Sequence, residues 1–427
     1  HFTFESNIQY SSFRWNYGKA VNPASPDVTV LDPSSQTIAF LGNPGYVFDS
    51  HENTFQLQEK LNLYKGNHTI KFGTELLSSD HLLFGGGNPN GSYTVQLTQS
   101  ELDEVIAKQL GSKLDVEDIP STAKVLSYGV ELRPTSFGKR QNIFSFYAED
   151  QFAASAKLNL TIGVRYDYDN LSAGGNSHGD YNNIAPRFSF NYKLSDRSAL
   201  RGGYGIFYDK ILYTIYSDAL QQNNTGTDFK KQLQYFVDQG IVPAGTNIDR
   251  VTFNGNLTVG ESNSAGLPFG YLNGPPASTY DNQRNLFSNE RRILNPNGYQ
   301  NPYTQQISLG YQYQIKSNQL FYVDLVYNKS NNLFRTRNLN VPSAWNSEVA
   351  GNTARATSWA DSTRALPIYS NGAVINAQVL SGVAKSVVMT ETSGESEYWA
   401  ASFNWQKDRG TGKLAYRLIY TLSYLRN

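Results

Sequence analysis

The chain has 427 residues, of which 36 are basic (Lys and Arg) and 36 are acidic (Asp and Glu), and it contains no cysteine. The balanced charge argues against a nucleic-acid-binding surface, and the lack of cysteine excludes a disulfide scaffold and a thiolate metal site. No run of about 18 apolar residues occurs, which excludes a transmembrane helix but not a transmembrane barrel. The sequence starts at His1, without an initiator methionine or a signal peptide, and this start predicts an internal part of a longer precursor.

Alternation of apolar and polar residues begins near residue 2 and recurs along the chain. In KLNLTIGVRYDYDN (157–170), every second residue from Leu158 to Tyr168 is apolar or aromatic, and Thr161, Gly163 and other residues stand between them. This period of two is that of a strand with one apolar and one polar face. Roughly eleven such strands are predicted, with ends placed to within about 2 to 4 residues, near 2–13, 53–64, 69–77, 142–152, 158–168, 185–194, 198–208, 303–315, 319–328, 398–407 and 414–424.

Short and long connections alternate between these strands. Turns of a few residues are expected at 64–68, 153–156, 194–198, 315–318 and 407–412, and long loops at about 14–52, 78–141, 169–184, 209–302 and 328–397. A soluble sandwich gives no reason for all long loops to lie at one end. Strands of about 11 residues, at about 3.3 Å each and a tilt of about 40°, rise about 28 Å, which matches a bilayer's apolar band. We therefore expect an all-β, transmembrane antiparallel β-barrel with short periplasmic turns and long extracellular loops.

Two of the long loops carry a helical pattern. SELDEVIAKQLG (100–111) offers Ser100 as a cap and Gly111 as a stop, and DFKKQLQYFVDQG (228–240) repeats the arrangement with Asp228 and Gly240. Apolar residues share one face of each segment, so small helices that pack into surface subdomains are expected.

Aromatic residues fall near the predicted strand ends. With the short turns at the periplasmic side, the upper set is Tyr166, Tyr168, Tyr327 and Tyr424, and the lower set is Tyr192, Tyr313, Trp405 and Tyr416. Two aromatic girdles are typical of an outer-membrane barrel. The alternative is that tyrosine and phenylalanine favour strands in any sheet.

Several motifs follow one another in an order that a known family shares: GNHTIKFGTEL (66–76), FSFYAEDQFAASAKLNLTIGVRYDY (144–168), NIAPRFSFNYKLSDRSALRGGYGIFYD (183–209), NPYTQQISLGYQYQI (301–315), NLFRTRNLNVP (332–342) and YTLSYLRN (420–427). Together they resemble the β-barrel of TonB-dependent outer-membrane receptors, in particular the Oar-like branch. The resemblance implies a 22-stranded barrel filled by a plug domain. Residues 1–427 then form about half of that barrel domain, with the plug and the closing strands outside the chain.

Charged residues in the polar phase are candidate contacts to a plug. Arg165, Asp167, Arg187 and Arg201 are expected to face the lumen, where they hold or guide the plug or belong to a solvated wall. Glu59 and Asp150 fall in the apolar phase instead. Asp150 lies close to a short turn, and a bulge that turns Glu59 inward is expected.

No site for catalysis is predicted. The five histidines lack metal-ligand spacing, and neither a nucleophile with a base nor a cofactor fingerprint occurs. We expect no enzyme, no metal and no cofactor.

The resemblance implies active transport of a large nutrient, such as a peptide, protein, glycan or chelate, across the Gram-negative outer membrane. The implied partners are outer-membrane lipid, the plug and the TonB–ExbB–ExbD system, with no nucleic acid. Two alternatives stay open: a passive porin-like channel, and a surface-binding or structural barrel that holds a partner protein through its outer loops.

Overall fold

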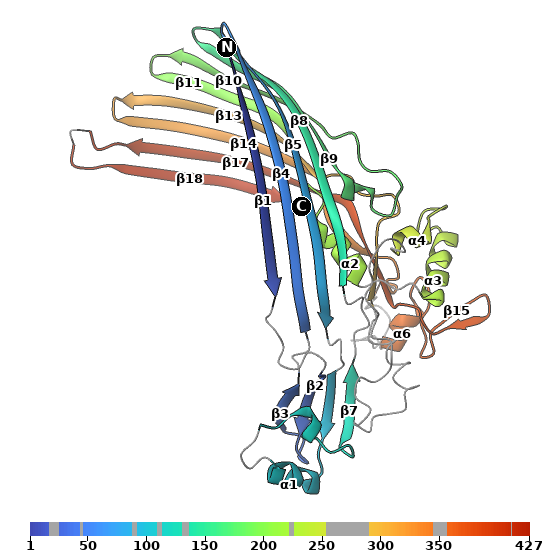
Figure 1. Ribbon diagram of the computed structural model, residues 1–427. Helices are drawn as coiled ribbons and strands as arrows, with labels where there is room; N and C mark the ends of the chain where they lie inside the picture. Colours follow the sequence, from blue (N-terminus) through green and yellow to red (C-terminus); the bar gives the residue numbers. More distant parts are fainter. Residues whose placement is uncertain are drawn as a thin grey trace, which may run out of the picture.

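A computed structural model describes residues 1–16, 25–42, 46–87, 92–108, 113–129, 136–221, 226–252, 290–344, 357–410 and 412–427. Its main feature is one twelve-stranded sheet that curves into an open trough (Figure 1). The short β12 (Glu290–Ile293) pairs in parallel with β17. The other eleven strands are antiparallel neighbours along the chain, and they are β1 (Phe2–Asn16), β4 (Tyr46–Lys65), β5 (His68–Gly87), β8 (Ser136–Ser155), β9 (Leu158–Asp169), β10 (Ile184–Ser195), β11 (Ser198–Tyr208), β13 (Tyr303–Lys316), β14 (Gln319–Asn338), β17 (Ser386–Lys407) and β18 (Tyr416–Arg426).

The strands run past both boundaries of three predicted loops. The loops expected at 14–52, 78–141 and 328–397 begin and end inside strands, because β4, β5, β8 and β14 are each 20 residues long and β17 is 22. Beyond the apolar belt these strands still pair with one another, but alternation fades there because an apolar face is no longer needed. Between β11 and β13, by contrast, the strands stop at Tyr208 and Tyr303.

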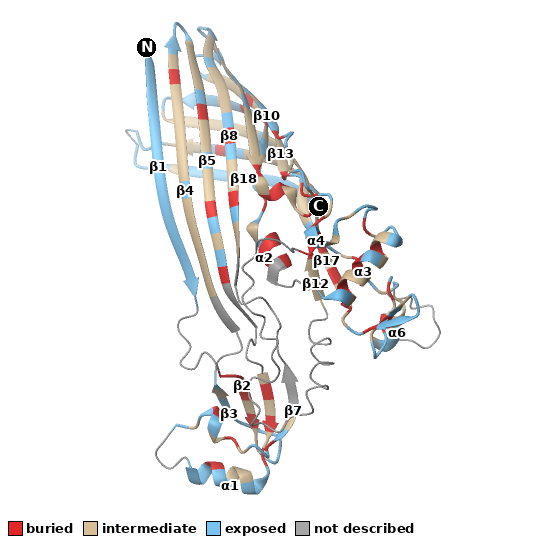
Figure 2. Ribbon diagram, turned by 45° about the vertical axis from the view of Figure 1, so that its right-hand side comes forward, coloured by how far each residue is buried: buried red, intermediate tan, exposed pale blue. Residues whose placement is uncertain are grey.

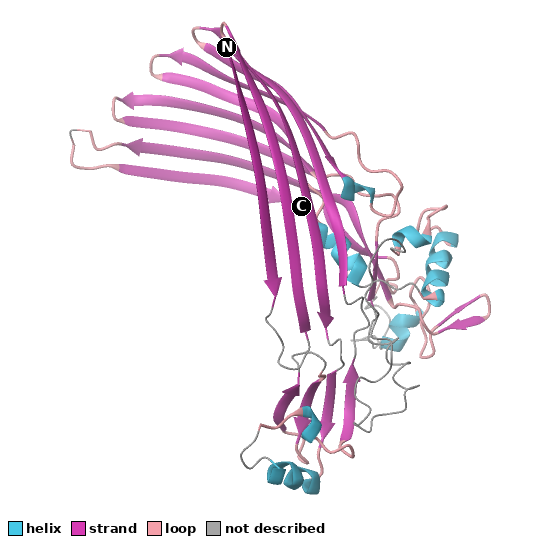
Figure 3. Ribbon diagram, viewed as in Figure 1, coloured by secondary structure: helices cyan, strands magenta, loops and turns pink. Residues whose placement is uncertain are grey.

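Among the described residues, the helices lie beyond the ends of the main strands (Figure 3). They are α1 (Gln99–Lys108), α2 (Tyr213–Gln221), α3 (Thr227–Asp238), α4 (Ile248–Val251) and α6 (Thr357–Ser362), with 3₁₀ turns at Val116–Asp118 and Asn170–Ala173. No helix in the described ranges is long and apolar enough to cross a membrane.

Both predicted helices form, with different caps. Thr98, not Ser100, caps α1: its hydroxyl accepts from the Glu101 N–H at 3.4 Å, and its own N–H donates to the Glu101 carboxylate at 2.8 Å. Gly111 lies outside the described residues. Helix α3 follows Gly226 without a side-chain cap, and Asp228 instead accepts from the Gly382 N–H at 3.0 Å.

Two loop subdomains and a smaller cluster hold most buried apolar side chains (Figure 2). The first subdomain, a four-stranded sheet with α1, consists of β3 (Thr37–Gly42), β2 (Asp27–Leu31), β6 (Ser92–Gln96) and β7 (Lys124–Gly129). The second joins α3 and α4 to β15 (Ala373–Ile375), β16 (Gln378–Leu380) and the start of β17. The third cluster packs Leu171, Ile211, Tyr216 and Tyr299 at the ends of β9 and β11. Each of these three units draws on loops that are distant in sequence.

Candidate functional site

The main sheet has one apolar and one polar face, and cross-strand register carries each face from strand to strand. Ile162 of β9 pairs with Phe188 of β10, and Val164 pairs with Ala148 of β8. Ile162 and Val164 are 51% and 44% exposed, far more than core residues of a soluble sheet. Thr161 and Arg165 point to the opposite face because side chains alternate along a strand.

Aromatic side chains gather at both ends of the apolar face. Near the short turns, Trp405 stands edge-on to Tyr416 at 5.4 Å between ring centroids, and Tyr313 pairs with Phe321. Tyr192 pairs with Leu200 at the same end. These residues lie next to the short turns, and a lower aromatic girdle at the membrane interface stays a prediction.

The opposite aromatic row includes one residue that the sequence analysis missed. Trp399 packs against Tyr327 at 4.1 Å between ring centroids and pairs with Tyr424 across β18. Tyr168 stacks on Tyr181 at 4.9 Å, and Tyr166 pairs with Phe146. Trp399 and Trp405 are separated by an even number of residues and therefore lie on the same face of β17. The alternation in β17 could have identified Trp399 from the sequence.

A charged network crosses the polar face of four strands. Arg165 Nε of β9 lies 2.8 Å from Asp167 Oδ1, and Arg165 Nη2 lies 3.4 Å from Glu75 Oε2 of β5. Ser145 of β8 donates to Asp167 at 2.6 Å. Gln56 and Gln58 of β4 donate to Glu75 Oε1 at 2.6 and 3.0 Å. Glu75 and the two glutamines were not singled out from sequence, because alternation shows which face a residue shares but not which strands meet.

Arg201 belongs to a second, separate network. Its guanidinium lies 2.7 Å from Asp324 Oδ1 and donates to Gln312 at 3.0 Å. The ion pair between Arg201 of β11 and Asp324 of β14 crosses β13 at Gly310. A Cβ added to Gly310 would collide with both Asp324 and Arg201. Glycine at this position therefore keeps the crossing open.

Arg187 stands apart from both networks. Its guanidinium lies over the ring of Phe207 at 4.6 Å, and its Nε is buried without a hydrogen-bond partner in the part of the chain that the structure describes. The four predicted charges thus share a face but do not form one cluster.

Of the two carboxylates in the apolar phase, Glu59 is held differently from expectation and Asp150 is placed as expected. The register of β4 with β1 and β5 runs unbroken through Glu59, so the expected bulge is absent and Glu59 stays on the apolar face. Asp150 lies near the short turn as expected, and its Oδ2 lies 2.8 Å from His68 Nδ1. Glu59 therefore stays in a regular strand, and a hydrogen bond from the Ser6 hydroxyl to Glu59 Oε1 at 2.8 Å takes the place of the bulge that we expected from the sequence.

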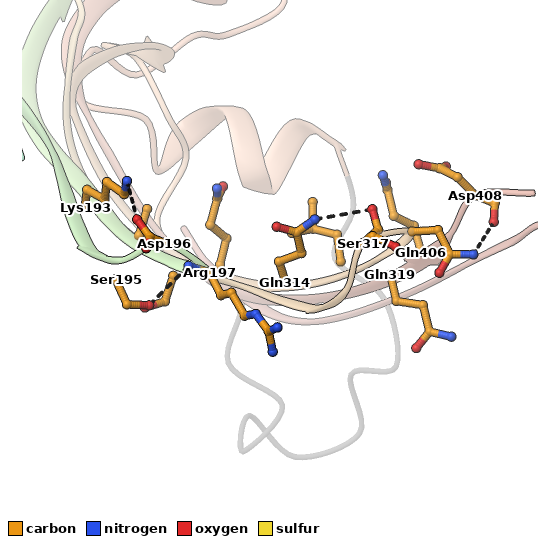
Figure 4. A pocket seen from close by; sticks show the side chains of 14 residues that line it. Lys193, Ser195, Asp196, Arg197, Gln314, Ser317, Gln319, Gln406 and Asp408 are labelled. Carbon is orange, nitrogen blue, oxygen red and sulfur yellow. Dashed lines mark hydrogen bonds and ion pairs between the residues drawn. The ribbon is translucent and has the colours of Figure 1, made fainter. Parts of the chain in front are cut away.

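The short turns form a polar rim around a cavity of about 330 Å³ (Figure 4). Two of these turns accept a backbone hydrogen bond from the neighbouring hairpin: Gln314 N–H donates to Arg197 O at 2.7 Å, and Asp408 N–H donates to Asn318 O at 2.9 Å. Lys193 lies 2.7 Å from Asp196 within one turn. The rim is thus linked from hairpin to hairpin.

In the second loop subdomain, Asp361 is a buried charge centre. Its side chain is 6% exposed, and its two oxygens lie 2.6 Å from Lys385 Nζ and 2.8 Å from Arg364 Nε. Burial alone would raise the pKa of Asp361, but hydrogen bonds from Lys385 and Arg364 outweigh burial and hold this pKa below its ordinary value.

Replacing Asp361 with alanine is expected to destabilise this subdomain by about 1.5 to 3 kcal/mol, the range for hydrogen bonds to charged groups. Because the folded-state pKa is lowered, the stabilisation is present above the unfolded value of about 4 and is lost as the pH falls below it. Hydrogen exchange of the Ile368 amide, which donates to the Asp361 carbonyl at 3.0 Å, measures the opening. Equal protection of wild type and Asp361→Ala at neutral pH would contradict the expectation.

Within the described ranges, no group of three or more His, Asp or Glu side chains is placed to hold a metal ion.

Comparison with known proteins gives a family match over nearly the whole chain. Residues 3–178 and 170–425 match a family described as "Outer membrane beta barrel domain". No curated protein matches.

Several solved structures are similar in fold. The outer membrane transporter YddB from Escherichia coli is 12% identical with a TM-score of 0.49, over 99% of this chain and 46% of that one. A mutant of the ferric enterobactin receptor PfeA from Pseudomonas aeruginosa is 12% identical with a TM-score of 0.47, over 99% and 41%. The siderophore receptor PirA from Acinetobacter baumannii is 12% identical with a TM-score of 0.44, over 99% and 42%. The chain therefore spans less than half the length of each.

The family match covers far more than half of the sequence, and the antiparallel sheet with its apolar and polar faces has the architecture that this family name describes. The chain belongs to the outer membrane beta-barrel domain family.

Proposed function

We propose that this chain is part of the barrel wall of a TonB-dependent transporter of the Oar-like branch, which imports a large nutrient across the outer membrane. The observation that carries the proposal is the charged network on the polar face, where Arg165 joins Asp167 and Glu75 across strands. Charge-assisted hydrogen bonds are strong and fix the orientation of the side chains that make them, so this network is a rigid polar surface against which a plug could dock.

The curvature of the sheet supports a wide barrel. Eleven antiparallel strands form an open trough in which β1 and β18 do not pair among the described residues (Figure 1). Barrel diameter grows with strand number, and barrels of about 22 strands have a plugged lumen. The apolar face of this wall meets outer-membrane lipid, and the polar face is proposed to meet the plug.

In this proposal the outer loops select the nutrient and the plug receives force from the TonB–ExbB–ExbD system. The folded loop subdomains support selection, because pre-ordered loops lose less conformational freedom when they bind. The size of the loops suits a large ligand such as a peptide, protein, glycan or chelate.

Ion conductance of the full-length protein in a planar bilayer tests the proposal without knowledge of the nutrient. A plugged barrel is expected to conduct little. Arg165→Ala removes the cation between Asp167 and Glu75, so we expect the plug to loosen and conductance to rise several-fold. Arg409→Ala, in an exposed turn, is the matched control and should change nothing.

Two outcomes of the same measurement would contradict the proposal. Large steady conductance of the wild type would indicate a passive porin. A closed wild type that is unaffected by Arg165→Ala would remove the plug-holding role of the network. Uptake of a fluorescein-labelled tryptic digest of casein, if it occurs, should stop when a protonophore collapses the proton-motive force.

A further inference from the structure

A cavity of about 510 Å³ lies between the second loop subdomain and the outer end of β14. Residues from 240–243 after α3, from 295–300 after β12 and from 389–393 of β17 line it together with Arg337 of β14, and we call it the Arg337 cavity. Pockets that bind small ligands usually enclose about 300 to 1,000 Å³ and often form where separate folded units meet. The Arg337 cavity therefore has the size and the setting of a binding site.

The Arg337 cavity stands outside the apolar belt, at the end of the sheet that carries the long loops. Gln319 begins β14 at a short turn, and Arg337 lies near the other end of that strand. At about 3.3 Å per residue and a tilt of about 40°, Arg337 stands about 45 Å above the short turn, whereas the belt is about 25 Å tall. The cavity is thus on the side where the outer loops would meet a nutrient.

Hydrogen bonds hold the walls of the Arg337 cavity in place. The Gln300 N–H donates to the Thr392 hydroxyl at 3.2 Å, which ties the segment 295–300 to β17. The Ile241 N–H donates to the Phe236 carbonyl at 2.9 Å, which fixes the segment after α3. A ligand that enters a site already ordered in this way loses less free energy to the ordering of loops.

The charged side chains at the cavity have one positive charge in excess. The Glu391 side chain is 15% exposed, and its two oxygens lie 3.0 Å from Arg337 Nη1 and 3.6 Å from Arg335 Nε. Two guanidinium groups therefore share one carboxylate among the described residues. A guanidinium carries five N–H donors in a fork that matches a carboxylate, and Arg337 uses one of them on Glu391. An anionic group of a ligand would balance the remaining charge.

Amide and apolar groups lie beside Arg337. Asn297 and Gln300 are exposed, and within the described ranges they form hydrogen bonds through their backbone N–H groups and not through their side-chain amides. Each side-chain amide offers donors and an acceptor, and a peptide group also offers both. Ile241 and Met389 add apolar surface to the same cavity, which suits an apolar side chain of a ligand.

We propose that the Arg337 cavity binds the C-terminal end of a short peptide. The free carboxylate of the peptide lies on the Arg337 guanidinium, its last peptide group pairs with the amides of Asn297 and Gln300, and its last side chain is apolar. Inorganic phosphate would satisfy the guanidinium alone, and a neutral sugar would leave the positive charge unbalanced. This inference rests on the proposed function, in which the outer loops select the nutrient, and it narrows that nutrient to peptides with a free carboxyl terminus.

The test uses the purified full-length protein in detergent and a chymotryptic digest of casein, in which most peptides end in an apolar or aromatic residue with a free carboxylate. Bound peptides are eluted and quantified by mass spectrometry. Arg337→Ala removes the guanidinium and should lower the bound amount at least tenfold. Asn297→Asp changes only the charge of an exposed side chain, so it should fold as wild type does and should also lower the bound amount. Arg250→Ala is the matched control, because it removes an exposed guanidinium of α4 outside the cavity, and it should bind as much as wild type.

The most enriched peptide, resynthesised with a C-terminal amide, should bind at least tenfold more weakly than the free acid. Equal binding of the amide and the acid, equal peptide yields from wild type and Arg337→Ala, or complete displacement by an equal concentration of inorganic phosphate would each overturn the proposal.

Binding in detergent needs neither movement of a plug nor a proton-motive force, so this test separates the peptide site from the transport function. A wild type that binds peptides but conducts as an open channel would refute plugged transport and leave the peptide site standing. A closed barrel that retains no peptide would refute the peptide site and leave the proposed transport function standing.

Discussion

Val164→Lys is expected to prevent stable insertion of the barrel, whereas Thr161→Lys on the same strand is expected to be tolerated. Val164 lies on the apolar face, 44% exposed, six residues above the first residue of β9. A lysine that faces lipid near the midplane costs about 2 to 4 kcal/mol, and the cost falls to about 0 to 1 kcal/mol near an interface. Thr161 alternates to the polar face, where its register partners are Gln151 and Ser189.

Urea titration of the full-length protein in liposomes, followed by tryptophan fluorescence, measures this difference. The heat-modifiable mobility of the folded barrel on a gel provides an independent readout. The reverse order, with Thr161→Lys damaging and Val164→Lys neutral, would assign the apolar face to the interior and would refute the orientation of the entire sheet.

Strand positions could be predicted from the sequence because the membrane imposes a strict pattern. A strand that faces lipid presents apolar side chains at most of its alternate positions over the height of the belt, and Leu158 to Tyr168 does so without interruption. Neighbouring hairpins in a barrel pair in chain order, so the order of the eleven antiparallel strands follows as well.

The loops were harder to predict because their cores are assembled from separate segments. In the first subdomain, β2 pairs in parallel with β6, and Val28 lies opposite Tyr93 although 65 residues separate them in sequence. In the second, Phe236 of α3 packs with residues such as Leu366 of another loop. Period and propensity describe a single segment, and neither reports which segments meet.

The sequence predicted which face the charged residues share, but it did not predict which residues they contact. Alternation placed Arg165 and Arg201 on one face, and the structure pairs each with a partner on a different strand, Glu75 and Asp324. Glu59 shows the opposite error. A charge in an apolar phase suggested a bulge, yet a single hydroxyl from Ser6 allows the regular register to continue. A charged residue in the apolar phase can be accommodated by a bulge or by a hydrogen bond from the neighbouring strand. The sequence of one strand does not show which neighbour it has, and so does not show which of the two occurs.

Asp169→Ala is expected to release the loop that follows β11 from the wall. Asp169 ends β9, and its carboxylate accepts from three donors: Gln141 Nε2 at 2.7 Å, the Ile211 N–H at 2.9 Å and the Leu171 N–H at 2.9 Å. Gln141 also donates to the Ile211 carbonyl at 2.9 Å, so Gln141 and Asp169 together hold both backbone groups of Ile211.

The expected loss is large because all of these groups are buried. Asp169 is 1% exposed, Gln141 2% and Ile211 0%. Alanine leaves three donors without an acceptor, and each donor that water cannot reach costs about 1 to 3 kcal/mol. We therefore expect Asp169→Ala to lower the free energy of unfolding of this loop by about 3 to 5 kcal/mol. Asp169→Asn keeps one acceptor oxygen and should lose less. Asp209→Ala, an exposed aspartate two residues before Ile211, should lie within about 0.5 kcal/mol of wild type.

Hydrogen exchange resolved to single amides separates local release from global unfolding. The Ile211 and Leu171 amides should lose protection in Asp169→Ala, while amides at the centre of β9 keep it. The Tyr216 hydroxyl donates to the Leu171 carbonyl at 2.6 Å, so α2 should loosen with them. Unchanged protection at Ile211 would show that the apolar cluster of Leu171, Ile211 and Tyr299 holds the loop by itself. The carboxylate would then serve only to satisfy donors that packing had already placed, and the loop's position would be set by apolar burial instead of by the Asp169 network.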